Sequence, residues 1–222
     1  MTSDVLPWHF QWLDGFYLYR SLRKILPSLG GKVLDVGCGK KPYQKLFGSI
    51  EEYVGLDVIA GPMVDVVVQP YERWPFYDDY FDVVLLTQVL EHAENLSQLL
   101  VETKRAVKPG VIVASFPFIY NEHGIPDDYW RISAYGGQRL FPDVTLLKIE
   151  RQGGIGSTIA LLLLNWWEDT LNLNNEPLRI YYCDQPGYMR GGPRVKYPLG
   201  GRRENLYYLN EELPYWFKYA PL

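Results

Sequence analysis

The sequence predicts an α/β fold: a Rossmann-like, doubly wound sheet whose strands are mostly parallel. Three observations support this. Short apolar runs at 33–36, 53–57, 64–68, 81–86 and 111–116 predict strands. Predicted helices separate several of these strands. The segment 91–107 has helical spacing, and the segment 42–49 begins with Pro42, a residue typical of the first turn of a helix. A glycine turn directly follows the first run, and a sixth strand is expected at 144–149.

Length and composition indicate one domain with peripheral additions. The chain has 222 residues, of which 47% are hydrophobic. We expect an aromatic-rich, N-terminal helical lead-in at 1–30, with a helix at about 12–26, a core at 31–152 and an irregular extension at 153–222. The net charge of −4 disfavours broad nucleic-acid binding. Two cysteines and no signal-peptide pattern favour a reduced, cytoplasmic protein without disulfides.

The turn after the first strand has a composition typical of a cofactor site. Asp35 interrupts the apolar run 33–36, and Gly37 and Gly39 follow it one residue apart. Asp57 stands 20 residues after Gly37, at the end of the second run. Strand, glycine turn, helix, strand and acid form the layout that binds an adenosine-type cofactor, with the acid on the ribose hydroxyls.

The spacing of the glycines separates two classes of cofactor. A dinucleotide site has the pattern G-x-G-x-x-G, but Pro42 stands at the third glycine position here, which disfavours an NAD-dependent dehydrogenase. The pattern D-x-G-x-G from Asp35 to Gly39 resembles motif I of the class I S-adenosylmethionine (SAM)-dependent methyltransferases.

Three further segments extend this resemblance over about residues 32–118. The stretch from Trp74 to Leu85 is similar to the "LPF…FDVV" signature of the methyltransferase type 11 family. Residues 88–92 are similar to its "evLeH" element, and 105–110 to its "RvLkpGG" element, with Val111 in place of the last glycine. The resemblance implies the class I methyltransferase fold and S-adenosyl-L-methionine as cofactor.

The resemblance also implies which residues bind the cofactor. Asp35, Gly37 and Gly39, with Cys38 between the glycines, would lie under the methionine part, and Asp57 would bind the ribose. Val58 would contact the face of the adenine, and Gln69 and the following Pro70 would lie near the adenine amino group. Gln88 would lie beneath the methyl group. For Gln88, capping of the next helix is an equal alternative.

The histidines do not predict a metal site. Neighbouring residues of a helix point about 100° apart, so Glu91 and His92 are not expected to converge on one atom. No two of His9, His92 and His123 stand at a metal-ligand spacing. We therefore expect no bound metal and a structural role for His92.

The segment 117–133 leaves the carboxyl edge of the predicted sheet, where open α/β folds bind ligands. It resembles an H-x-x-P-x-D-(Y/F)-(W/F)-R segment of a methyltransferase subgroup, several members of which are thought to act in surface-glycan or lipid-linked sugar pathways. In one interpretation His123 is the general base for a substrate hydroxyl, oriented by Asp127 or Asp128, with Tyr129 and Arg131 on the substrate side.

A structural interpretation of the same segment stays open. One of the two aspartates would then pair with Arg131 and cap a helix beginning near Asp128, while His123 fixes the loop.

The C-terminal third contains an apolar run and a basic cluster. The apolar run 155–167 is shorter than the roughly 20 residues that span a bilayer. It predicts a buried helix in the favoured interpretation, or one that contacts a membrane surface. The basic residues could receive phosphate groups or form a solvated loop: Arg190, Arg194, Lys196, Arg202 and Arg203. A seventh strand is expected at 206–209 or 215–219.

Together these features predict a SAM-dependent methyltransferase. The expected acceptor is a small or lipid-linked molecule, such as a sugar, methylated on oxygen, with no nucleic acid as partner. The alternative is a catalytically silent SAM-binding scaffold with the same fold. The sequence does not indicate an oligomeric state.

Overall fold

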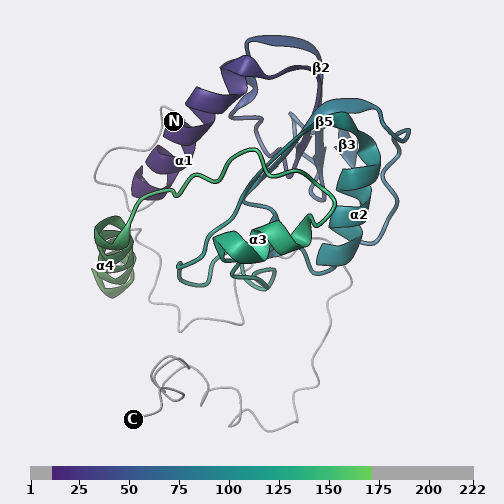
Figure 1. Cartoon of the computed structure of the whole chain (residues 1–222). Coiled ribbons are helices and arrows are strands. Elements are labelled where there is room, and N and C mark those ends of the chain that lie inside the picture. Colours follow the sequence, from purple (N-terminus) through teal and green to yellow (C-terminus); the bar gives the residue numbers. More distant parts are fainter. Residues whose placement is uncertain (1–11, 172–222) are drawn as a thin grey trace, which may run out of the picture. The chain divides into compact units, whose positions relative to one another are not determined.

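A computed structural model describes residues 12–171, which lie in the first of two units of the chain, Met1–Tyr188 and Met189–Leu222. Five parallel strands form one sheet: β1 (Gly30–Val36), β2 (Ser49–Asp57), β3 (Val66–Val67), β4 (Phe81–Thr87) and β5 (Val107–Ser115) (Figure 1). Their order is β3-β2-β1-β4-β5, and every neighbouring pair is parallel. The predicted α/β fold is therefore confirmed.

The order of the strands creates a switch point beside β1. The chain moves outward from β1 through β2 to β3, then returns to the other side of β1 as β4. Open α/β sheets bind ligands outside the carboxyl ends of the strands at such a point. The residues that follow β1, β2 and β4 therefore belong to the favoured ligand-binding edge.

Helices cover both faces of the sheet, because successive strand residues point to opposite sides. On one face Leu18, Leu22 and Leu26, from α1 (Trp12–Ile25) and the turn after it, share a buried cluster with Val33 and Leu85.

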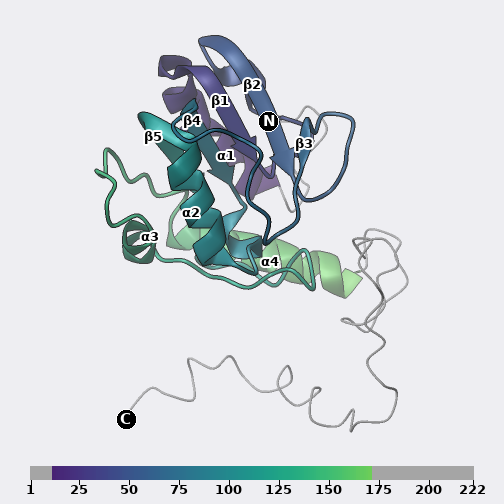
Figure 2. The ribbon, with the colours of Figure 1, turned by 90° about the vertical axis from the view of Figure 1, so that its right-hand side faces the viewer.

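On the other face α2 (Leu96–Ala106) contributes Leu96 and Leu100 to a cluster that contains Leu34 and Leu86 (Figure 2). Val33 and Leu34 are neighbours in β1 and bury opposite faces of it, which explains why both are apolar.

Two predicted helices are shorter than expected. Only a 3₁₀ turn, Gln44–Leu46, forms in the segment 42–49, and α2 begins at Leu96 rather than at residue 91. A separate 3₁₀ turn, Leu90–His92, precedes it. The side chain of Asn95 accepts a hydrogen bond from the Gln98 amide at 3.1 Å, which caps α2 and fixes its start.

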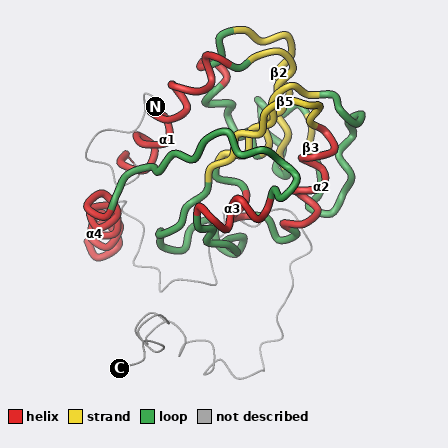
Figure 3. Tube along the Cα trace, in the orientation of Figure 1, coloured by secondary structure: helices red, strands yellow, loops and turns green. Residues whose placement is uncertain are grey.

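The strand predicted at 144–149 is wrong. These residues lie in a loop that follows α3 (Ala134–Leu140), and they pair with no strand in the described part of the chain (Figure 3). Leu146 is 53% exposed and Leu147 78% exposed, so no apolar burial stabilises an added strand. The candidates for a seventh strand and the basic cluster lie outside the described residues.

The apolar run near the C-terminus forms α4 (Ile155–Leu171), but most of its described side chains are exposed. Leu161 and Asn165 are buried, whereas Leu163, Trp166 and Trp167 are more than half exposed. The favoured interpretation of a buried helix is therefore wrong for most of these side chains. Among residues 12–171, no helix has the length and apolar character needed to cross a bilayer.

Candidate functional site

The glycine turn after β1 lies where the sequence predicted it and requires glycine for two reasons. Gly37 and Gly39 have positive φ angles of 65° and 48°, which residues with a Cβ rarely adopt. A Cβ on Gly37 would also lie 2.6 Å from Cγ2 of Val89, in the turn after β4. The amides of Gly37 and Cys38 donate to the carbonyl of Leu56 at 2.8 and 3.2 Å, which fastens the turn to β2.

Asp57, the last residue of β2, meets this turn directly. Its Oδ2 accepts a hydrogen bond from the Gly39 amide at 3.1 Å, and its Oδ1 accepts from the amides of Val58 (2.7 Å) and Ile59 (3.0 Å). The structure thus brings the predicted glycine turn and the predicted acid together at one edge of the sheet. A carboxylate offers about four lone-pair positions, so three amide bonds leave it able to accept another donor.

Asp35 lies beneath the turn and is 1% exposed. Its Oδ2 accepts a hydrogen bond from the hydroxyl of Tyr53 at 2.7 Å, while Oδ1 has no hydrogen-bond partner among the described residues. Burial raises the pKa of Asp35 to about 6, although the bond from Tyr53 opposes this shift. The acid therefore joins β1 to β2 through Tyr53, inside the sheet.

The other predicted cofactor residues surround this edge. Cys38 is buried, and burial raises the pKa of its thiol to about 12, so it is not a reactive thiolate. Gln69 and Pro70 follow β3 and are exposed, and the Gln69 amide donates to Oε2 of Glu72 at 2.9 Å. Their contact with adenine stays a prediction.

Gln88 connects the carboxyl ends of two strands. It follows β4 with a φ angle of 55°, its amide donates to the Ser115 carbonyl at 2.9 Å, and its Nε2 donates to Ser115 Oγ at 3.1 Å. The alternative of helix capping is wrong, because Asn95 caps α2 and the intervening 3₁₀ turn has no side-chain cap. A place beneath the methyl group stays a prediction.

The loop after β5 is organised around the side chain of Asp128, which is 3% exposed. Arg131 donates to its two oxygens at 2.6 and 2.7 Å, a bidentate pair. The His123 amide donates to Oδ2 at 2.9 Å, and His123 Nδ1 lies 3.4 Å from the same oxygen. Arg131 also donates to the carbonyls of Tyr120 and Asn121, so it closes the loop.

These contacts select among the predicted roles of the two aspartates. The acid beside His123 is Asp128, not Asp127, whose Oδ1 accepts a hydrogen bond from the Tyr129 hydroxyl at 3.0 Å. The predicted pairing of Arg131 is confirmed with Asp128. The predicted cap near Asp128 is wrong, because α3 begins at Ala134 and the Ser133 side chain caps it.

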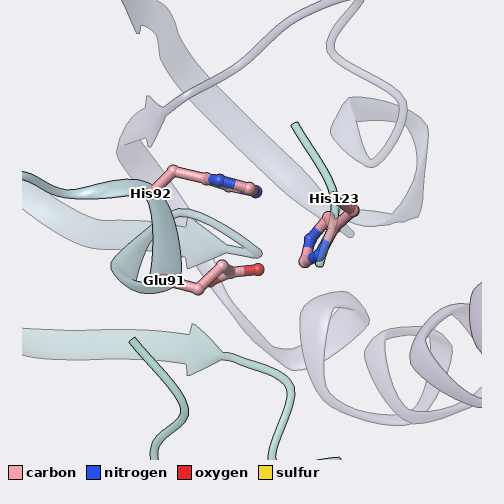
Figure 4. Close-up of side chains that lie close together, drawn as sticks. All are labelled: Glu91, His92 and His123. Atoms are coloured by element: carbon pink, nitrogen blue, oxygen red, sulfur yellow. The ribbon is translucent and has the colours of Figure 1, made fainter. Parts of the chain in front are cut away.

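Three side chains converge between the turn after β4 and this loop. Ligand atoms of Glu91, His92 and His123 all lie within 4.8 Å of one another, and the side chains point into one space (Figure 4). The prediction that Glu91 and His92 do not converge is wrong: they stand in a 3₁₀ turn outside α2, and their ligand atoms lie within 4.8 Å of each other. Sequence spacing could not reveal His123, which is brought to them by the fold.

Backbone contacts hold the two segments together. The amides of Tyr129 and Trp130 donate to the Glu91 carbonyl at 2.8 and 3.1 Å. The rings of His92 and His123 meet edge to face with 4.8 Å between centroids. A Cβ on Gly124, whose φ is 64°, would lie 3.0 Å from the His92 ring.

His123 is held in its neutral form at neutral pH. Burial lowers the pKa of His123 below its ordinary value, although the nearby Asp128 carboxylate acts in the opposite direction. A neutral imidazole keeps one nitrogen lone pair for accepting a proton or binding a metal ion.

The turn, the acid and the parallel sheet define a protein of the α/β class that binds an adenosyl cofactor. Residues 34–115 match the family model described as a methyltransferase domain. The predicted family and its cofactor, S-adenosyl-L-methionine, are thereby confirmed.

Two curated proteins are similar over parts of the chain. An uncharacterized protein of Methanocaldococcus jannaschii is 30% identical over 107 residues, covering 45% of this chain and 52% of that protein. A tRNA U34 carboxymethyltransferase of Desulfotalea psychrophila is 26% identical over 190 residues, covering 76% of this chain and 52% of that protein. The chain spans about half the length of each relative.

Solved structures with a similar fold include SAM-dependent methyltransferases. The one from Archaeoglobus fulgidus is 18% identical, covers 70% of this chain and 87% of its own, and has a TM-score of 0.46. The one from Aquifex aeolicus is 18% identical, covers 62% of this chain and 82% of its own, and has a TM-score of 0.42.

Proposed function

We propose that this chain is a SAM-dependent methyltransferase that methylates a hydroxyl oxygen of a small-molecule acceptor. The observation that carries the proposal is that His123 is held beside Asp128 at the same edge of the sheet as the glycine turn, where burial favours the neutral imidazole by lowering its pKa. The contact between Gly37 and Val89 brings the turn after β1 next to the turn after β4. Cofactor and acceptor can therefore meet there.

The cofactor would bind along the carboxyl ends of β1, β2 and β3. Asp57 would accept hydrogen bonds from the ribose, and Val58, Gln69 and Pro70 would contact the adenine. Among the described residues, no heavy atom lies within 4 Å of the position of a Cβ on Gly39, so a ligand can approach the backbone there. SAM supplies an electron-poor methyl group and a good leaving group, so the protein must mainly align the acceptor and exclude water.

His123 would remove the proton of the acceptor hydroxyl. Its Nδ1 lies near two acceptors, Oδ2 of Asp128 and the carbonyl of Asn121 at 3.3 Å, so Nδ1 carries the proton and Nε2 is free to act. A hydroxyl of high pKa needs such a base, whereas a neutral amine does not. Asp128 would be the positioning residue, in place of Asp127, and Tyr129 would border the acceptor.

A first experiment compares the wild-type chain with His123→Ala by calorimetric titration with SAM and by release of S-adenosylhomocysteine. We expect similar SAM affinities and a turnover lowered by about 10²–10⁴-fold, because only the proton transfer is removed. Asp128→Asn should also lower turnover while Asp127→Asn should not. Equal turnover in His123→Ala would remove this histidine from the mechanism, and SAM binding without any product would favour the silent scaffold.

The acceptor class is tested by varying the substrate. Free sugars, lipid-linked sugars and transcribed tRNA are offered in parallel, since one relative is named as an enzyme of tRNA. Methylation of a sugar hydroxyl is the expected result. Methylation of tRNA alone, which the net charge of −4 disfavours, would contradict the proposed acceptor.

We also propose a cytoplasmic location with contact to a membrane surface through residues 155–167. The exposed apolar side chains of α4 support such a contact.

A further inference from the structure

We propose that Glu91, His92 and His123 bind a divalent transition-metal ion of the zinc class. Two imidazole nitrogens and one carboxylate oxygen converge within 4.8 Å, and their side chains point into one space at the carboxyl edge of the sheet (Figure 4). The proposal reverses the expectation that the chain has no metal site, since that expectation rested on spacing along the sequence. In the proposed function the ion would take over the base role of His123, and the proposal rests on that function only for the role of the ion in catalysis.

The hydrogen bonds of His92 fix which of its nitrogens is available. Its Nδ1 lies 2.5 Å from the carbonyl oxygen of Asp127, which can only accept a hydrogen bond. Nδ1 must therefore carry the proton, and Nε2 keeps the lone pair that a metal ion needs. A metal-binding histidine almost always donates its other ring N–H to a carbonyl or carboxylate in this way.

His123 has the same arrangement. Its Nδ1 lies 3.3 Å from the Asn121 carbonyl and 3.4 Å from the Asp128 carboxylate, which are both acceptors. Its Nε2 therefore also keeps a lone pair. Each imidazole is thus oriented by an outer partner, and each presents one unprotonated nitrogen.

Glu91 supplies the negative charge. Its side chain is completely buried, where a carboxylate is expensive unless positive charge compensates it. Asp128 and, more weakly, Glu91 raise the pKa of Arg131, so this guanidinium provides part of that charge. A cation bound by Glu91 would add to this compensation directly.

The donor set and the geometry favour ions such as Zn²⁺ and Co²⁺. Imidazole nitrogen suits these ions, and two histidines with one carboxylate occur in zinc sites that keep a fourth position open. Bonds of about 2.1 Å require ligand atoms roughly 3.4 Å apart, so the side chains must approach one another on binding. The fourth position would face the acceptor.

The bound ion, or His123 when no ion is bound, would promote loss of the proton from the acceptor hydroxyl. When the ion is bound, Nε2 of His123 is a ligand and cannot accept a proton. The ion would supply the chemistry that lowers the pKa of a hydroxyl at the open position, as it does for water at catalytic zinc sites. The proton would leave to solvent, and the oxygen would stay available for the methyl group.

The test is a titration of the metal-free, full-length chain with Co²⁺, followed by visible absorption, and with Zn²⁺, followed by equilibrium dialysis. We expect one ion per chain, with absorption bands of tetrahedral Co²⁺ and displacement by Zn²⁺. His92→Ala, His123→Ala and Glu91→Gln should each weaken binding at least about tenfold. Glu122→Gln, an exposed acid beside His123, and His9→Ala should bind as the wild type does.

Absence of Co²⁺ binding, or binding unchanged in His92→Ala and His123→Ala, would overturn the proposal. A SAM titration of the same samples shows that each variant is folded, because the predicted cofactor residues are untouched. Failure of the metal proposal leaves SAM binding and product release intact. If the proposed function is wrong, the chain neither binds SAM nor releases product, whatever its metal content.

Discussion

At the scale of single residues, Gly37 is the position in the glycine turn where an added Cβ would come closest to another atom. Replacing it by alanine should destabilise the chain in two ways. A φ of 65° strains the backbone of a residue with a Cβ, and that Cβ would lie 2.6 Å from Cγ2 of Val89. We expect Gly37→Ala to destabilise the chain by more than the roughly 1–2 kcal/mol of a positive φ alone. Gly39→Ala, with a φ of 48° and open space, is the matched control.

Denaturant unfolding measures both variants, and calorimetry measures their affinity for SAM. The double variant Gly37→Ala/Val89→Ala should recover part of the lost stability, since the smaller side chain makes room. If Gly37→Ala and Gly39→Ala were equally destabilising, the contact with Val89 would have no energetic weight.

The buried acid beneath the turn predicts a pH dependence. The pKa of Asp35 is about 6 in the folded chain, above its ordinary value of 3.8. A carboxyl whose pKa is raised by folding favours the folded state fully below pH 3.8, and this stability is lost as the pH rises through 6. Relative to Asp35→Asn, the wild type should lose about 3 kcal/mol between a pH well below 3.8 and a pH well above 6.

Unfolding at a series of pH values without cofactor, with the variant subtracted from the wild type, isolates this contribution from the other carboxyls. A difference that does not change with pH would show that Asp35 titrates alike in both states.

The sequence identified residues that stand close together in one motif, and missed contacts between residues that lie in separate motifs or depend on loop geometry. Asp35, Gly37 and Asp57 follow from a pattern within 23 residues of chain. The hydroxyl of Tyr53 on Asp35 and the carboxylate of Asp128 beside His123 depend on side-chain directions that no spacing encodes. Asp127 and Asp128 are neighbours, so only the loop geometry could separate them.

At the scale of elements, α2 is joined to the loop before β4 by hydrogen bonds of Arg105 and Glu102 and by the ion pair between Arg105 and Asp78 at 2.7 Å. Arg105 donates to Glu102 at 2.6 Å and to the carbonyls of Trp74 (3.0 Å) and Phe76 (2.7 Å). Glu102, whose side chain is 5% exposed, also accepts from the Trp74 amide at 2.8 Å. Burial opposes the charge of Glu102, but Arg105 and this amide together lower its pKa.

Arg105→Met should therefore destabilise the chain by about 3–5 kcal/mol, because it leaves a buried carboxylate without its cation. Glu102→Gln/Arg105→Met should be more stable than Arg105→Met, since it removes the uncompensated charge. Thermal and denaturant unfolding of the two variants and of the wild type completes the comparison. A double variant less stable than Arg105→Met would contradict this account.

The elements themselves were predictable where burial is continuous. The runs that became β1, β2, β4 and β5 are apolar because helices cover both faces of the sheet. The segment 144–149 has the same composition but no partner strand and no covering layer among the described residues. The start of α2 depends on the cap by Asn95 rather than on periodicity.

At the scale of the whole molecule, the described part of the chain presents an apolar helical surface. The exposed side chains on α4 include Ile155, Ile159, Leu163, Trp166 and Trp167. Lipid interfaces bind such surfaces through apolar side chains and tryptophan. We expect the full-length chain to float with phospholipid vesicles, and Trp166→Ser/Trp167→Ser to reduce the bound fraction severalfold.

Tyr77→Ser provides the control, since this aromatic side chain is 82% exposed in the loop before β4. Flotation that is absent, or equal in all three proteins, would remove α4 as the contact. The sequence predicted this helix correctly but favoured burial, because composition shows how apolar a helix is and not which neighbours cover it.

The close packing of Gly37 against Val89 affects how kinetic constants of variants of this chain are interpreted. Val89 stands two residues before Glu91, so a substitution that shifts Val89 would disturb the proposed cofactor site and the proposed acceptor site together. Apparent Michaelis constants for both substrates should then rise together. Such a joint rise would reflect the packing that the two proposed sites share rather than direct contact of the substituted residue with either substrate.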